Sequence, residues 1–301
     1  MEVKITDQHI SIFYICVSAI FICFNFAGIV PSTTTQLYLF LIGALIIGLP
    51  HGALDYDVAT YLGWCNSLAK KTLFLTIYSL IALIFFALWI GYPEIIFSLF
   101  LVVSVRHFGE DWDMKPLSYL RQCIFGMAFL SLPTLYHQAA VTELFNFFVP
   151  QAFGYQLTNL LHIIAIPILA IALIFLVTDL WSKKTVYALR VVAFIVGAMF
   201  LPPLLFLFLY FCTFHSVKHT QDLYHRLKYK NFKIMAKKQI LIMLLTLVFV
   251  GGIFLYQKKS FDISASLFSS VIILIACVTT PHMLLIDYFN YKEKRLLKHF
   301  S

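Results

Sequence analysis

Ten apolar stretches, separated by short polar segments, dominate the pattern of the chain. They cover residues 10–30, 36–50, 72–92, 94–107, 119–135, 157–178, 185–201, 203–219, 239–256 and 265–282. A helix needs roughly 20 apolar residues to cross a bilayer, so the pattern predicts about ten membrane helices. The stretches at 36–50 and 94–107 are short, which predicts tilted, broken or re-entrant helices. Pro93 and the pair Pro202-Pro203 predict tight reversals, because proline disfavours helix at the residue before it.

The basic residues divide unevenly between the polar segments. If every stretch crosses the membrane, 20 of the 22 Lys and Arg residues lie on one side, and only Lys258 and Lys259 lie on the other. Cytoplasmic segments carry the excess of Lys and Arg in membrane proteins. The distribution therefore predicts an all-α, polytopic helical bundle in the inner (plasma) membrane, with both termini in the cytoplasm. We expect residues 1–301 to form a single transmembrane catalytic domain.

Composition supports the membrane class and excludes several others. The chain is 61% hydrophobic and only 12% charged, whereas soluble domains carry roughly 25% charged residues. The net charge of +8 comes from basic residues between the apolar stretches, which indicates anionic lipid head groups rather than nucleic acid as partners. The first stretch, Ile10 to Val30, is too long for a cleaved signal peptide. Six cysteines without a CxxC motif indicate neither a disulfide framework nor a thiolate metal site.

Five of the ten histidines lie at the cytoplasmic ends of even-numbered stretches. These are His51, His107, His215, His219 and His282. We expect them to converge at one depth in the membrane, where ionisable groups are costly and usually functional. His215 and His219 lie four positions apart, so on a helix their side chains would stack on one face, within reach of one metal ion. Neutral imidazole suits iron, zinc or copper. The alternative is a set of interfacial histidines that are each hydrogen-bonded to a backbone carbonyl.

The remaining polar residues allow two interpretations. The other histidines are expected to be solvated or satisfied within the core: His9, His137, His162, His225 and His299. Six carboxylates follow a histidine within a few residues: Asp55, Asp57, Glu110, Asp111, Asp222 and Asp287. A ligating histidine usually donates its second N–H to a carboxylate or a carbonyl. Some of these side chains are therefore candidate partners of ligands, and others are solvated loop residues.

A site made of histidines alone restricts the chemistry. Neutral ligands leave a divalent metal with its full charge and with open positions, which suits Fe(II) and O2 better than zinc hydrolysis. The chain contains no GxSxG, HExxH or glycine-rich phosphate-binding motif. Aromatic residues make up 17% of the chain, which is compatible with a long apolar substrate but is weak support on its own.

Four motifs together resemble a known family. "GLPHGALDYD", "RHFGEDW", "FHSVKHTQDL" and "TTPHMLLIDY", in this order and spacing, resemble the Brp/Blh family of bacterial and archaeal membrane β-carotene 15,15′-dioxygenases. The resemblance runs from about His51 to Tyr288. It implies Fe(II) as the cofactor, with His51, His107, His215 and His219 as metal ligands. His282 matches a further motif position and is kept as a candidate site residue.

The resemblance also implies an activity. Such an enzyme cleaves the central double bond of β-carotene with O2 and supplies retinal to a microbial rhodopsin, to which it can hand over its product. A transporter or channel with a histidine-lined path for metal ions or protons is the alternative from another class. A di-iron desaturase or hydroxylase needs about eight histidines, and a haem-binding electron carrier needs paired histidines on facing helices.

Overall fold

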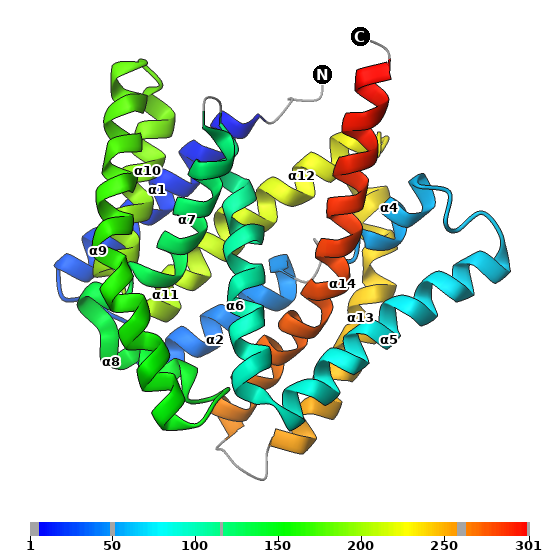
Figure 1. The fold of residues 1–301 in the computed structure, drawn as a ribbon, viewed down its shortest axis with the longest axis horizontal. Coiled ribbons are helices and arrows are strands. Elements are labelled where there is room, and N and C mark those ends of the chain that lie inside the picture. Colours follow the sequence, from blue (N-terminus) through cyan, green and yellow to red (C-terminus); the bar gives the residue numbers. More distant parts are fainter. Residues whose placement is uncertain (1–5, 49–51, 115–116, 258–262, 300–301) are drawn as a thin grey trace. The chain divides into compact units, whose positions relative to one another are not determined.

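The computed structural model describes residues 6–48, 52–114, 117–257 and 263–299, and every element in these ranges is helical (Figure 1). The predicted all-α class is confirmed. The chain divides into two compact units. Unit 1 comprises Met1–Gly48 and Phe97–His219, and unit 2 comprises Leu49–Ile96 and Thr220–Ser301. The single catalytic domain stays a prediction.

Unit 1 holds most of the helices. They are α1 (Asp7–Phe26), α2 (Thr33–Gly43), the π-helix η1 (Ala44–Gly48), most of α6 (Pro93–Gly109), the 3₁₀-helix η2 (Glu110–Trp112), α7 (Ser118–Ser131), α8 (Thr134–Phe145), α9 (Gln151–Trp181), α10 (Thr185–Phe200), α11 (Pro203–Phe208), the π-helix η3 (Leu209–His215) and the first turn of α12 (Ser216–Arg226). Unit 2 holds α4 (Asp55–Tyr61), α5 (Leu68–Gly91), the rest of α12, α13 (Phe232–Gln257) and α14 (Ile263–His299).

Each of the ten apolar stretches overlaps a helix. A new helix begins at each of the two proline sites, since α6 begins at Pro93 and α11 begins at Pro203. Proline fits the first turn of a helix, where its missing N–H has no partner to lose. The short stretch at 36–50 changes from α-helix to π-helix at Ala44. The apolar pattern did not predict α4 and α8, which are short and less apolar.

Among the described residues, four helices are long and apolar enough to cross a membrane. They are Asp7–Phe26, Leu68–Gly91, Gln151–Trp181 and Ser266–Glu293. On α5, apolar side chains such as Leu73, Leu80 and Leu88 are exposed. Exposed apolar side chains along a helix of this length are suited to a hydrocarbon environment.

The core of unit 1 is aromatic, and it lies beside the end of α6. Trp112 stacks on Phe125 of α7 with ring centroids 4.0 Å apart. Helices α6 and α7 approach closely at Gly126 of α7, where a Cβ atom would overlap the backbone carbonyl of Val105 in α6. Glycine therefore allows α7 to lie directly on α6 near His107.

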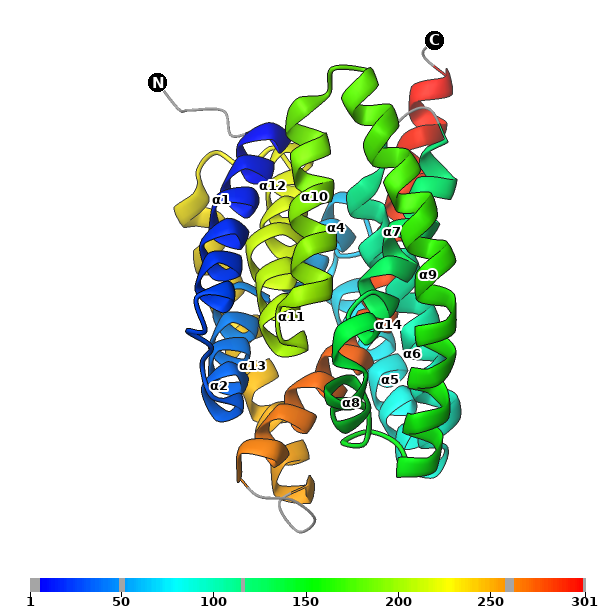
Figure 2. The same ribbon diagram turned by 90° about the vertical axis from the view of Figure 1, so that its left-hand side faces the viewer.

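Buried charges in unit 1 are paired. Arg121 of α7 makes a bidentate ion pair with Asp179 of α9, and both side chains are 4% exposed. Arg190 of α10 lies 3.3 Å from Asp7 of α1, and α1 packs along α10 (Figure 2). Because an unpaired buried charge is strongly destabilising, each pair constrains the helices that carry it.

Unit 2 is built around α14, which packs against α4, α5 and α13. Its apolar core includes Leu54, Val58, Met235 and Phe289. Arg226 covers the ring of Phe289 with its guanidinium group 4.1 Å from the ring centroid. The core therefore joins helices that are far apart in sequence.

Candidate metal centre

Three histidines of unit 1 come together at the ends of two helical segments. His107 lies near the end of α6, His215 ends the π-helix η3, and His219 lies in the first turn of α12. The ring centroid of His107 lies 4.6 Å from that of His215 and 6.5 Å from that of His219. His107 and His215 are 7% and 2% exposed. The predicted convergence is found for these three residues, named here the histidine cluster.

The spacing of His215 and His219 produces the predicted shared face. The chain returns to α-helix at Ser216, and residues four apart then lie one above the other. The two rings are stacked, with centroids 6.4 Å apart and an interplanar angle of 18°. Before them, η3 is a π-helix, a form that occurs frequently at functional sites. The wider turn of η3 changes which face of the segment His215 occupies.

Asp111 fixes the orientation of His215. Its Oδ2 lies 2.8 Å from Nδ1 of His215. Burial raises the pKa of Asp111, but the charges of His215 and Lys218 and the hydrogen bonds from His215 and Tyr210 lower it by more, so the net pKa is below its ordinary value. An ionised carboxylate only accepts hydrogen bonds, so Nδ1 of His215 carries the proton. In the neutral imidazole, which is the form that binds a metal, Nε2 is then the nitrogen with a lone pair.

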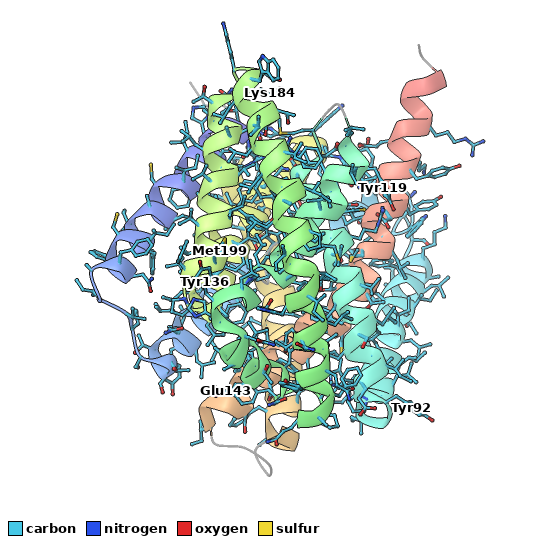
Figure 3. The ribbon with its side chains drawn as sticks, turned by 60° about the vertical axis from the view of Figure 1, so that its left-hand side comes forward. Tyr92, Tyr119, Tyr136, Glu143, Lys184 and Met199 are labelled. Carbon is cyan, nitrogen blue, oxygen red and sulfur yellow. The ribbon has the colours of Figure 1, made fainter. Side chains whose placement is uncertain are left out.

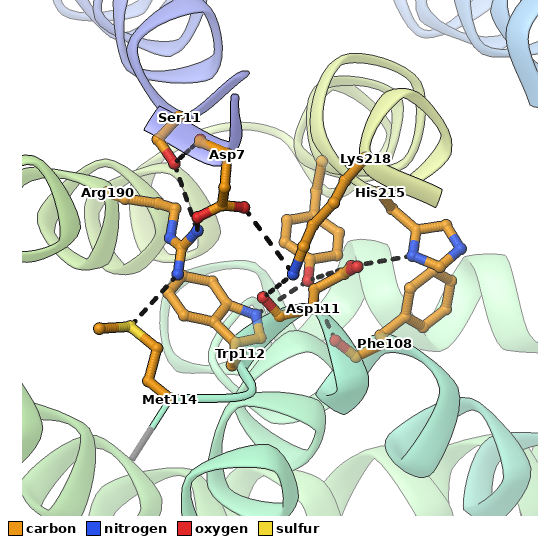
Figure 4. A network of polar contacts seen from close by, with 10 residues as sticks. Asp7, Ser11, Phe108, Asp111, Trp112, Met114, Arg190, His215 and Lys218 are labelled. Atoms are coloured by element: carbon orange, nitrogen blue, oxygen red, sulfur yellow. Dashed lines mark hydrogen bonds and ion pairs between the residues drawn. The ribbon is translucent and has the colours of Figure 1, made fainter. Parts of the chain in front are cut away.

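Further side chains hold Asp111 in place (Figure 4). The hydroxyl of Tyr210 lies 3.0 Å from Asp111 Oδ2 and 3.2 Å from the carbonyl of Phe108, and it accepts a hydrogen bond from Trp112 Nε1 at 2.9 Å. Nζ of Lys218 donates to the backbone carbonyl of Asp111 at 2.6 Å. These contacts fix both the side chain and the backbone of Asp111.

The network continues to the N-terminal helix. Asp7 of α1 lies 3.9 Å from Nζ of Lys218, and Arg190 contacts both Asp7 and Ser11. The guanidinium group of Arg190 also lies 4.8 Å from the centroid of the Trp112 ring. Figure 4 shows these groups on one side of Asp111, with His215 on the other. The polar groups behind the histidine cluster therefore come from several helices.

The three imidazoles are chemically suited to a metal ion, and the distances between their rings show which of them lie close enough to share one. With metal–nitrogen bonds of about 2.0–2.1 Å, two imidazoles on one ion have centroids within roughly 6.4 Å of each other. The pair His107 and His215 lies well inside this limit, and the two pairs that include His219 lie at it. As placed, the described part of the chain contains no group of three or more His, Cys, Asp or Glu side chains that could hold an ion. His219 has to move inward for the three rings to share one.

Unit 2 contains a second buried histidine that is held by a carboxylate. Nδ1 of His282 lies 2.7 Å from Oδ1 of Asp55, and the hydroxyl of Tyr78 donates to Oδ2 of Asp55 at 2.6 Å. His282 and Asp55 are 3% and 4% exposed. The three residues come from α14, α4 and α5. This arrangement is named here the His282 triad.

The remaining predicted residues have varied positions. His51 lies outside the described residues. Glu110 forms an ion pair with Arg106 at 3.4 Å, with partly exposed side chains, and Asp222 is exposed. His162, which was expected to be satisfied within the core, lies 3.0 Å from the carbonyl of Thr134.

Sequence reasoning missed several residues of the site. Tyr210 and Tyr78 lie inside apolar stretches, where nothing distinguishes them from aromatic residues of the core. Lys218 stands between the two histidines of the motif "HSVKH" and was counted only as a basic residue of the cytoplasmic side. Its position one residue before His219 was the available signal. The absence of a disulfide framework was expected, and the six cysteines are free.

Comparison with known proteins gives two matches. The family model for β-carotene 15,15′-dioxygenase matches residues 42–290. A protein from an uncultured marine bacterium, 66A03, named β-carotene 15,15′-dioxygenase, is 30% identical over 258 residues, which cover 81% of this chain and 90% of that relative. No solved structure matches. The histidine cluster and the His282 triad both fall inside the matched region.

Proposed function

Because the chain belongs to the β-carotene 15,15′-dioxygenase family, we propose that it cleaves the central double bond of β-carotene with O2. In this reaction the bond between C15 and C15′ breaks, and each carbon gains one oxygen atom as an aldehyde. The products are two molecules of all-trans-retinal, and no other reductant or oxidant is needed. The proposed enzyme is thus an oxidoreductase that incorporates O2.

The observation that carries this proposal is the histidine cluster within the matched region. Three imidazoles from α6, η3 and α12 lie with their rings 4.6–6.5 Å apart. One of them is oriented by a buried carboxylate, which is the usual arrangement for a histidine that binds a metal. The cluster lies within residues 42–290, which the family model matches.

We propose Fe(II) as the cofactor, with His107, His215 and His219 as ligands. His51 completes the set, on the basis of the family resemblance. Iron(II), when bound, supplies the position at which O2 is activated beside the polyene. Imidazole is a suitable ligand for iron, and neutral ligands preserve the charge of the ion.

The protein side chains orient the site and restrict water. Asp111 accepts the Nδ1–H of His215 and directs Nε2 away from itself. The rings of Phe108 and Phe211 lie 4.8 and 5.8 Å from the ring of His215, the second of them stacked on it. Apolar rings at this distance limit the access of water and suit a hydrocarbon substrate. Binding then holds the central double bond in register with the site.

Production of retinal in cells that make β-carotene tests the proposal. We would express the wild-type chain, His215→Ala and His225→Ala in such cells and measure β-carotene and retinal by chromatography. His225 is an exposed histidine of α12 and provides the matched control. The wild type and His225→Ala should bleach the cells and form retinal, whereas His215→Ala should do neither.

Two results would count against the proposal. Folded wild-type protein that leaves β-carotene intact would remove carotene cleavage as the function. Uptake of metal ions by the same cells would then favour the transporter. Retinal formation by His215→Ala at the wild-type rate would remove the histidine cluster as the reaction site.

We further propose ten membrane crossings in the inner membrane, with both termini in the cytoplasm. The 20-to-2 division of Lys and Arg supports this topology. Within unit 1, Lys184 and Glu143 lie at opposite ends (Figure 3), as the proposed topology requires. Reporter fusions at each terminus should give cytoplasmic signals, and a periplasmic signal from either would contradict the topology.

The product also has a proposed destination. Retinal is an apolar aldehyde that forms inside the membrane, so a microbial rhodopsin in the same bilayer is the partner that we propose. Co-expression of the wild-type chain with a rhodopsin apoprotein in cells that make β-carotene should give a coloured pigment. Failure to form pigment while retinal accumulates would argue against hand-over.

A further inference from the structure

The His282 triad is a buried polar arrangement that the proposed ligand set does not use. The carboxylate of Asp55 receives two hydrogen bonds, one from the hydroxyl of Tyr78 at 2.6 Å and one from Nδ1 of His282 at 2.7 Å. The hydroxyl of Tyr78 also lies 3.4 Å from the carbonyl of Val278, so it sits against the backbone of α14. All of these contacts lie within unit 2.

The triad repeats the arrangement around His215. In both places a buried carboxylate accepts the Nδ1–H of a histidine, and a tyrosine hydroxyl lies within hydrogen-bond distance of the same carboxylate. A carboxylate at Nδ1 fixes the tautomer, leaves the lone pair on Nε2 and makes that nitrogen more basic. The chemistry that suits His215 for a metal therefore suits His282 equally.

Stability alone does not account for this arrangement. Burial of an ionisable pair costs desolvation energy, and apolar residues of similar volume often hold helices together as well or better. Unit 2 already has an apolar core, which includes Leu54, Leu285 and Phe289. A carboxylate and an imidazole at 3–4% exposure add a specific chemical group that apolar packing does not require.

We infer that His282 is a further metal-binding residue of this enzyme, which ligates through Nε2 and is positioned by Asp55 and Tyr78. The inference rests on the proposed function, because it assumes that the chain binds Fe(II). It assigns Asp55 of unit 2 the role toward His282 that Asp111 of unit 1 has toward His215.

A pair of substitutions separates metal binding from packing. His282→Asn places an amide N–H near the position of Nδ1, so it can keep the hydrogen bond to Asp55 while Nε2 is lost. The matched control is His162→Asn, since His162 lies in α9, outside the site, and its Nδ1 lies 3.0 Å from the carbonyl of Thr134. Full-length protein would be purified, stripped with a chelator and titrated anaerobically with Fe(II) alone, and the thermal midpoint of the metal-free form would be measured.

We expect His282→Asn to keep the thermal midpoint of the metal-free wild type and to weaken Fe(II) binding at least about tenfold. His162→Asn should bind Fe(II) as the wild type does. Fe(II) affinity of His282→Asn equal to that of the wild type would overturn the inference, whatever the activity of the variant. If His282→Asn does not fold, His282→Ala replaces it because alanine carries no metal-binding group, and wild-type Fe(II) affinity in that folded variant overturns the inference in the same way.

The outcome also separates this inference from the proposed function. Wild-type protein that binds Fe(II) through His282 but leaves β-carotene intact would refute the carotene-cleaving function and support the metal-binding role. Wild-type protein that does not bind Fe(II) would refute both. Carotene cleavage with unchanged Fe(II) affinity in His282→Asn would refute the inference alone.

Discussion

The two buried Tyr–Asp–His arrangements, one in each unit, differ in how the carboxylate is used. In unit 1, His215 and Tyr210 both approach Oδ2 of Asp111, at 2.8 and 3.0 Å. In unit 2, His282 and Tyr78 approach different oxygens of Asp55, at 2.7 and 2.6 Å.

The surroundings differ as well. Asp111 has support on several sides, since Lys218 donates to its backbone carbonyl and Trp112 donates to the hydroxyl of Tyr210. The carboxylate of Asp55 is held by Tyr78 and His282. The comparison teaches that a shared pattern of donors and acceptors can be supported to different degrees. The structural effect of a substitution near Asp111 should therefore reach more neighbouring residues than that of a substitution near Asp55.

The largest effect should come from the carboxylates themselves. Asp111→Asn removes the charge that fixes the tautomer of His215, and loss of such a partner typically costs about 10–100-fold in metal affinity. Asp55→Asn should have an effect of the same order if His282 binds the metal. Fe(II) titration measures both, with Glu143→Gln of α8 as the control. A loss in Asp111→Asn without a loss in Asp55→Asn would break the comparison.

The next effect should come from Gly48, which lies against the π-helix before His215. A Cβ atom there would lie 2.5 Å from Phe211, whose ring stacks on that of His215 at 5.8 Å. Gly48→Ala should therefore displace Phe211 and destabilise the protein by about 1–3 kcal/mol, as overpacking typically does. We expect retinal formation to fall with it.

Gly251→Ala provides the control for this substitution. A Cβ atom at Gly251 meets no atom within 4 Å, and alanine favours helix over glycine. Thermal unfolding and retinal formation would be measured for both variants. If Gly48→Ala and Gly251→Ala have the same thermal midpoint and form retinal at the same rate, then packing at Gly48 does not affect the histidine cluster through Phe211.

The tyrosines should give a smaller effect that differs between the units. Tyr210→Phe removes a donor near Asp111 and also leaves Trp112 Nε1 without its acceptor, which should cost about 1–3 kcal/mol. Tyr78→Phe removes the donor to Asp55 and should cost about 0.5–1.5 kcal/mol. Denaturant unfolding would compare the two variants. If Tyr78→Phe lowers the free energy of unfolding more than Tyr210→Phe does, then Asp55, and not Asp111, depends more strongly on its tyrosine.

The smallest effect is expected at Glu110. Its ion pair with Arg106 spans one helical turn and is partly exposed, and such pairs contribute about 0.2–1 kcal/mol. Glu110→Gln should change retinal formation by less than about twofold. If Glu110→Gln lowers retinal formation as much as Asp111→Asn does, then Glu110 also acts on the histidine cluster.

The contrast between Glu110 and Asp111 illustrates the limit of sequence reasoning. Both follow His107 in one motif, and the sequence does not distinguish them. The 3₁₀ turn η2 buries Asp111, which then contacts His215 rather than His107, the histidine that it follows. Which carboxylate serves which histidine depends on contacts across more than 100 positions of sequence, and local spacing carries no information about them.

The apolar pattern and the prolines predicted most of the helices, but not α4 and α8. The apolar stretches and the prolines at Pro93 and Pro203 correspond to helices and to their first residues. The histidine spacing predicted the stacked pair His215 and His219 because four residues make about one turn. The change to π-helix at Leu209 was not predicted, since it arises from packing rather than from a local signal.

Reconstitution of metal-free protein tests the central claim most directly. Purified, chelator-treated protein would be supplied with Fe(II) or with Zn(II), given β-carotene and O2, and assayed for retinal. We expect retinal with Fe(II), little or none with Zn(II), and none from His215→Ala with either ion. Equal retinal formation by the metal-free protein and the Fe(II)-loaded protein would contradict it.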